Sequence, residues 1–119
     1  AETATDKLLN YAGLKREDLL DTSEFATGLI GVNIMNPKGK EWFNTWKQYM
    51  LDGMFGGNRV HDTNDSESAT FRFSRQDQSA NSVILYKMGI TTCGETEDFL
   101  AYKDTGYNPA KILFFVGGI

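Results

Sequence analysis

The spacing of apolar and polar residues predicts two short helices near the start of the chain. Three apolar residues share one face of the first helix: Leu8, Leu9 and Ala12. Thr5 or Asp6 can cap this helix, and Gly13 can end it in the left-handed conformation that glycine favours. Residues 16–20 are predicted to form the second helix.

The clearest helical pattern lies in residues 36–53, NPKGKEWFNTWKQYMLDG. Asn36 can cap this helix, Pro37 suits its first position, and Gly53 can end it. Its apolar residues follow the three-and-four spacing of one buried stripe: Trp42, Phe43, Trp46, Tyr49 and Met50. We interpret this stripe as core, and a stacking platform for a ligand is the alternative.

A third pattern predicts a helix that begins at Ser74 and ends at Gly89. Its inner face is predicted to carry Ala80, Val83, Ile84 and Met88. Lys87 falls among these positions and would have to extend its ammonium group to water. We therefore expect this face to be only partly covered.

Strands are predicted in four segments. Residues 25–34, FATGLIGVNI, read as a buried strand, and residues 70–73 alternate between polar and apolar. Residues 99–102 and 111–117 are the other two candidates, and residues 54–68 read as a long loop. The whole pattern predicts an α/β fold, a mixed sheet with packed helices, in a single domain over residues 1–119.

Composition narrows the class of protein. The chain has 119 residues, of which 40% are hydrophobic and 24% charged, as expected for one globular domain. A net charge of -4 argues against binding to nucleic acid or to a membrane surface, because both need clustered Lys and Arg. Residues 112–116, among the longest apolar runs, are far shorter than the roughly 20 residues that span a bilayer. We expect a soluble protein, and a cytoplasmic location is favoured.

Nucleophilic and metal-assisted chemistry find little support in the sequence. The single Cys93 cannot form an internal disulfide and has no second ligand at metal-binding spacing, since His61 is the only histidine. Gly28 and Gly31 lack the spacing of a phosphate-binding loop. The acidic residues within 95–98 are expected to form a solvated turn, and no metal site is evident in this chain.

Two segments nevertheless resemble a known family when they are taken together. They are EFATGLIGVNIMNPKGKEWFNTW and SRQDQSANSVILYKMG. Together they resemble the acceptor-side, C-terminal half of glycosyltransferases that have the GT-A fold and use nucleotide-sugar donors. The matching residues are Phe25, Thr27, Gly28, Trp46, Arg75, Asp77, Gln78 and Ser79. The resemblance spans roughly residues 22 to 90, and RQDQS is its most specific part.

The resemblance implies a sugar-binding site at the start of the last helix. Asp77 would be the catalytic residue, acting on the sugar or on the attacking hydroxyl, with Arg75 and Gln78 as polar neighbours. Gly28, with Thr27 beside it, would contact the donor sugar. The partners implied are a nucleotide-sugar and a carbohydrate acceptor. Capping explains Asp77 equally well, because an acidic residue is favourable in the first turn of a helix.

Departures from the family pattern limit what this chain could do alone. The family holds Mn²⁺ or Mg²⁺ with an Asp-x-Asp motif in its nucleotide-binding half, and no such motif follows an apolar strand here. Ala26 stands where many relatives have an amide side chain. We expect either a fragment that lacks an N-terminal half or partner chain, or a relative that is inactive alone. The competing hypothesis is a small non-catalytic α/β binding or structural module.

Overall fold

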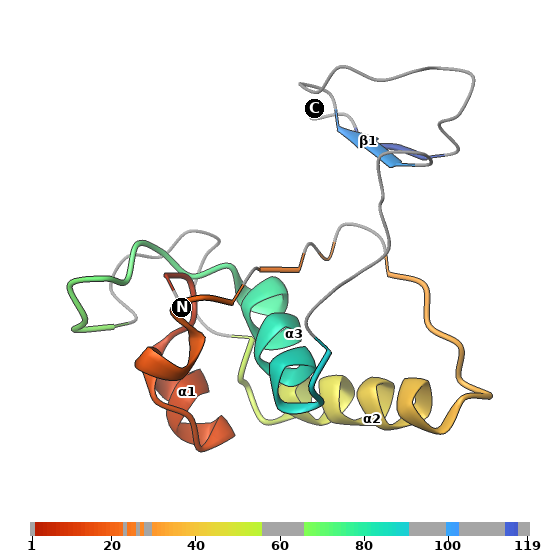
Figure 1. Ribbon diagram of the computed structural model, residues 1–119, viewed down its shortest axis with the longest axis horizontal. Coiled ribbons are helices and arrows are strands. Elements are labelled where there is room, and N and C mark those ends of the chain that lie inside the picture. The colour runs from red at the N-terminus through yellow and green to blue at the C-terminus, as the bar shows by residue number, and fades with distance from the viewer. Residues whose placement is uncertain are drawn as a thin grey trace.

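The computed structural model describes most of the first ninety residues and two short segments beyond them. The described residues are 2–22, 24–25, 27, 30–55, 66–90, 100–102 and 114–116. In chain order the elements are α1 (Asp6–Ala12), the 3₁₀ helix η1 (Arg16–Leu19), α2 (Pro37–Leu51), α3 (Gln76–Lys87), β1 (Leu100–Tyr102) and β2 (Phe114–Val116) (Figure 1).

The predicted mixed α/β fold is wrong for the described part of the chain, in which helices α1, α2 and α3 form the packed body. The strands found there, β1 and β2, pair in parallel over three residues each, from Leu100 opposite Phe114 to Tyr102 opposite Val116. Figure 1 shows this pair lying apart from the three helices. No sheet therefore supports the helices in the described residues.

Two of the predicted strands are replaced by irregular backbone whose hydrogen bonds go elsewhere. Described residues 25, 27 and 30–34 form no ladder, and the Phe25 N–H donates to the Ser82 hydroxyl of α3 over 2.9 Å. In residues 70–73 the Arg72 N–H donates to the Glu2 carbonyl over 2.8 Å. Alternating apolar residues make a strand only when a neighbouring strand pairs with their backbone, and these segments meet helices and turns instead.

The first two helices agree with the sequence prediction. The Thr5 hydroxyl accepts from the Leu8 N–H over 3.1 Å, and Gly13 ends α1 in the left-handed conformation with φ +69°. Residues Leu8, Leu9 and Ala12 are buried as predicted. At its end α1 also meets the end of α2, where the Tyr11 hydroxyl donates to Asp52.

Helix α2 is confirmed, but its buried stripe is narrower than predicted. Asn36 caps it by accepting from the Lys38 N–H over 2.9 Å, and Pro37 occupies the first turn. Trp42 and Tyr49 are buried and Trp46 is half-buried. The other two residues of the predicted stripe, Phe43 and Met50, are 43% and 47% exposed. The prediction was wrong for these two because only one side of α2 packs against the rest of the helical body.

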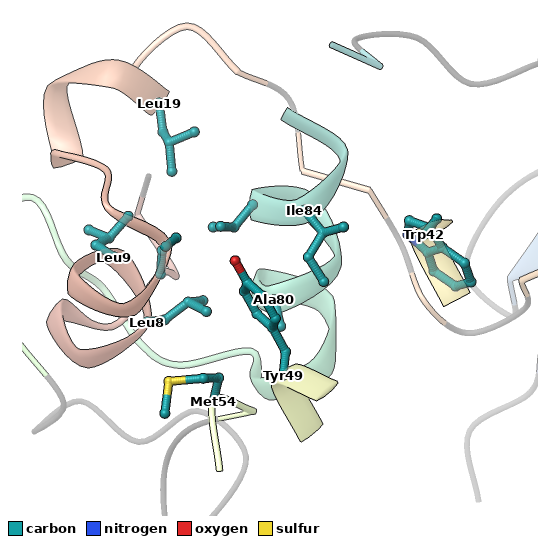
Figure 2. Packing of buried hydrophobic residues seen from close by; sticks show 11 residues of the cluster. Leu8, Leu9, Leu19, Trp42, Tyr49, Met54, Ala80 and Ile84 are labelled. Carbon is teal, nitrogen blue, oxygen red and sulfur yellow. The ribbon is translucent and has the colours of Figure 1, made fainter. Parts of the chain in front are cut away.

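Helix α3 packs against both α1 and α2. Figure 2 shows Leu8, Leu9 and Leu19 on one side of α3 and Trp42 on the other. The buried residues of α3 are therefore not a single apolar stripe: they are Ser79, Ala80, Asn81, Val83 and Ile84. Met88, predicted among the inner residues, is half-buried. Lys87 donates to the carbonyl of Ala12, the last residue of α1, over 2.6 Å, so its ammonium has a protein acceptor where water was expected.

Candidate functional site

The residues predicted as a sugar site at the start of α3 meet a carboxylate that the sequence did not single out, Glu24. The Gln78 side-chain amide donates to Oε2 of Glu24 over 2.9 Å, and Nη1 of Arg75 lies 3.4 Å from the same oxygen. The Thr3 hydroxyl donates to Oε1. The Glu24 side chain is 26% exposed, so this cluster lies at the surface. The structure thus brings Arg75 and Gln78 together on an internal acidic partner.

Asp77 stands apart from this cluster. It lies in the first turn of α3 and is half-buried, and within the described residues its carboxylate makes no hydrogen bond or ion pair. The helix begins at Gln76, two residues later than predicted, and the Ser74 hydroxyl accepts from the Gln76 N–H over 3.3 Å. A negative charge at this end of a helix is favourable because it opposes the helix dipole.

The other predicted sugar contacts are placed only in part. Thr27 is half-buried, and Gly28 lies outside the described residues, as does Ala26. The neighbouring Phe25 is held to α3 through Ser82, whose hydroxyl in turn donates to the Gln78 carbonyl over 3.0 Å. Residues 24–25 are therefore attached along α3 by side-chain hydrogen bonds.

A small cavity lies beneath the Glu24 cluster. Its volume is about 20 Å³, and it is lined by Thr3, Ala4, Leu19, Thr22, Glu24, Ser79, Ser82 and Val83. A volume of this size holds about one water molecule, which leaves no room for a sugar ring. Arg75, Asp77 and Gln78 are absent from its lining. The walls of the cavity mix apolar side chains with hydroxyl groups and the Glu24 carboxylate, and its size does not favour carbohydrate binding.

The two tryptophans of α2 pack against each other and against neighbouring side chains. The rings of Trp42 and Trp46 stack with centroids 5.4 Å apart, and Phe55 lies against Trp46 at 5.2 Å. The Trp42 indole N–H donates to Oδ1 of Asn81 over 2.9 Å. The inner side of α2 therefore serves the core, as the preferred interpretation of its sequence held, and these stacked faces are not a platform for a ligand.

A buried cation forms a second polar cluster, which the sequence also did not reveal. The Arg16 side chain is 9% exposed, and its Nη2 donates to the Ala4 carbonyl, to Asp6 and to the Ser66 hydroxyl. The Ser66 hydroxyl and the Arg16 guanidinium hold the pKa of Asp6 below its usual value. This cluster ties α1, η1 and residues 66–67 together through internal partners, so its role is structural.

One surface of α2 has the opposite character and carries exposed apolar side chains together with lysines. We call it the outer strip of α2 and define it as Lys40, Phe43, Lys47, Met50 and Leu51. At 3.6 residues per turn these five residues share one side of the helix, adjacent to the buried side. Leu51 is 64% exposed, and neither lysine forms an ion pair with any described residue. The sequence did not reveal this strip because Phe43 and Met50 fit the spacing of the core stripe.

No group of three or more His, Cys, Asp or Glu side chains in the described residues could hold a metal ion. The Mn²⁺ or Mg²⁺ implied by the family resemblance thus finds no ligand set in that part of the chain. The described part of the chain does not include His61, Cys93 or residues 95–98. Among the same residues, no helix combines the length and apolar character that crossing a membrane requires.

No protein-family model, curated protein or solved structure matches the chain.

Proposed function

We propose that this chain is a non-catalytic helical interaction module that binds a partner protein through the outer strip of α2. The single observation that supports the proposal is the strip itself, three exposed apolar side chains and two lysines along one side of the longest helix. Scattered exposed apolar residues are ordinary in proteins, but apolar residues grouped on one face are typical of interaction sites.

The polar groups at the start of α3 support the same conclusion because they bond to other groups of this chain. Arg75 and Gln78 both contact Glu24, and Ser79 donates to the Thr3 carbonyl over 2.9 Å. Groups used in this way fix the segment that precedes α1 and the segment around residue 24 against α3. A catalytic site needs polar groups that face a space large enough for substrate, and the adjoining cavity is too small for one.

The docking role can be tested by placing a photo-crosslinking amino acid at Phe43 and, in a control protein, at Leu20, which is 60% exposed outside α2. We expect the Phe43 position to form an adduct with one defined protein. After purification, that partner should lose roughly tenfold or more in affinity with Phe43→Ser or Met50→Ser, as expected for a central apolar contact. Leu20→Ser should leave the affinity unchanged. Adducts that form equally at both positions would contradict the proposal.

A second candidate is the glycosyltransferase implied by the family resemblance, with a nucleotide-sugar donor and a carbohydrate acceptor. The observation that favours it is the convergence of Arg75 and Gln78 on Glu24 at the start of α3, where the Asp77 carboxylate has no partner among the described residues. The GT-A sheet that would position these residues is not seen in those residues. Activity would therefore require a nucleotide-binding half, with its Mn²⁺ or Mg²⁺, from a longer chain or from a partner chain. For either candidate, a cytoplasmic location remains a prediction.

A further inference from the structure

We infer that the element recognised by the outer strip of α2 is an acidic amphipathic helix of the partner protein. This inference rests on the proposed function and adds the chemistry of the partner. Phe43, Met50 and Leu51 need apolar side chains to cover them, and Lys40 and Lys47 need carboxylates. A helix that carries an apolar stripe flanked by Asp and Glu supplies both.

The charges on α2 are segregated around its axis. The carboxylates of this helix and its C-cap, Glu41 and Asp52, lie on a different side from the outer strip, because each is about 100° or more away from Phe43 and Lys47. Asp52 is moreover engaged with Tyr11 and Gln48. Within α2 the strip thus carries lysines and no carboxylate, on a chain whose net charge is -4. At physiological salt, charges more than about 8 Å away are largely screened, so the lysines nearest a docked partner contribute most to its electrostatic attraction.

The start of α2 adds to this positive charge. Helices α1 and α3 carry an acidic residue in the first turn, whereas α2 has none and carries Lys38 and Lys40 near its start. The helix dipole adds a partial positive charge at the same end. The carboxylates of a bound helix should therefore be most numerous near residues 38–40. The strip covers residues 40–51, about 17 Å along the axis, which matches roughly three turns of a partner helix.

Two other occupants fit the strip less well. A second copy of the chain, packed symmetrically through the same surface, would bring four lysines together without any carboxylate from the strip. An anionic membrane surface is recognised by clusters of about four to eight basic residues. The strip has two, on a chain of negative net charge. Carboxylates on an amphipathic helix are the simplest complement to two lysines that flank apolar side chains.

The inference is tested with three synthetic helical peptides that share one leucine face and carry Glu, Gln or Lys at the remaining positions. Calorimetric titration into the full chain gives the dissociation constant of each. We expect the Glu peptide to bind about fivefold or more tightly than the Gln peptide, the range expected for two exposed ion pairs. The Lys peptide should bind most weakly. Replacing both Lys40 and Lys47 with Gln should remove the difference between the Glu and Gln peptides. Glu41→Gln is the control that should keep it.

The outcomes separate this inference from the proposed function. Equal binding of the Glu and Gln peptides, with both lost on Phe43→Ser, would overturn the acidic partner and leave the interaction module standing. Failure of all three peptides to bind would overturn the acidic helix, and joined with equal crosslinking at Phe43 and Leu20 it would also overturn the module. Binding to phosphatidylserine vesicles but not to the Glu peptide would assign the strip to membranes. A dimer in sedimentation that is lost on Phe43→Ser would assign it to a second copy.

Discussion

The indole N–H of Trp42 donates to the side-chain oxygen of Asn81 across the interface between α2 and α3, over 2.9 Å. Trp42 is 6% exposed and Asn81 is 3% exposed, so water cannot replace either partner. A buried polar group is costly without a hydrogen bond, and this pair therefore fixes which side of α3 faces α2.

Replacing Asn81 with Ala should destabilise the protein by about 1–3 kcal/mol, because the buried indole N–H would lose its acceptor. The free energy of unfolding is measured by urea titration followed by far-UV circular dichroism. The double variant Trp42→Phe with Asn81→Leu removes both polar groups. Its loss of unfolding free energy should be smaller than the sum of the losses for Trp42→Phe alone and Asn81→Leu alone. Additive effects of the single changes would show that the two side chains are not coupled.

Gly39→Ala should destabilise the chain although alanine is the better helix former. A Cβ at position 39 would lie 2.2 Å from the Asn33 carbonyl oxygen, so the turn before α2 would have to move. Helix propensity favours alanine by about 1 kcal/mol, and overpacking of this kind costs about 1–3 kcal/mol, so the clash should dominate. Thermal unfolding measures the difference. Gly31→Ala, where a Cβ would meet no atom within 4 Å, is the matched control. An increase in stability for Gly39→Ala would show that residues 30–36 adjust freely.

The protein should become less stable in acid because the Asp6 carboxylate is protonated there. Its pKa is lowered from the ordinary 3.8, first by the Ser66 hydroxyl and then by Arg16, so the folded state favours the ionised carboxylate. The stabilisation is present above the unfolded value of 3.8 and is lost as the pH falls below it towards the lower folded pKa. Urea unfolding between about pH 6 and about pH 3 should show a shallower loss for Asp6→Asn. The loss of stability for Ser66→Ala should lie between those of the unaltered protein and Asp6→Asn. If the free energy of unfolding fell equally with pH in all three proteins, Asp6 would not be the source of the acid sensitivity.

Asp77→Asn decides whether the glycosyltransferase candidate survives. If Asp77 acts on the sugar, hydrolysis of the donor sugar by the full-length protein should fall by about 10²–10⁴-fold, the usual contribution of an acid or base group. Glu41→Gln removes an exposed carboxylate from α2 and should leave turnover unchanged. If Asp77 serves only the helix start, its loss should cost about 0.3–1 kcal/mol of stability, without effect on turnover.

The helices could be predicted from sequence because their signals are local. Thr5 and Asn36 cap the helices that follow them, and Gly13 and Gly53 have the positive φ that ends α1 and follows α2. Each of these signals acts within one or two turns of the chain. The prediction of a mixed sheet was wrong because strand pairing depends on a distant partner. The alternation at residues 70–73 cannot reveal that partner.

Part of the polar cluster around Glu24 could be predicted for the same reason. Arg75 and Gln78 do come together, since Arg75 is the N-cap of α3 and Gln78 lies in its first turn. Their common partner Glu24 is more than fifty residues away in the chain, so no local pattern indicated it. The exposure of Phe43 and Met50 was missed because the width of a buried face depends on how many elements pack on it, which the helical period does not encode.

The central place of α3 has a consequence for how the protein is made. Its residues 76–87 supply the side chains that pack against both α1 and α2, and its contacts with Thr3 and Ala12 join positions about 75 residues apart. During synthesis the earlier helices lack their packing partner α3 until that stretch has been translated. Until then the newly made chain exposes Leu8, Leu9 and Trp42. Chaperone binding to nascent chains should be strongest before α3 emerges and should decline after it.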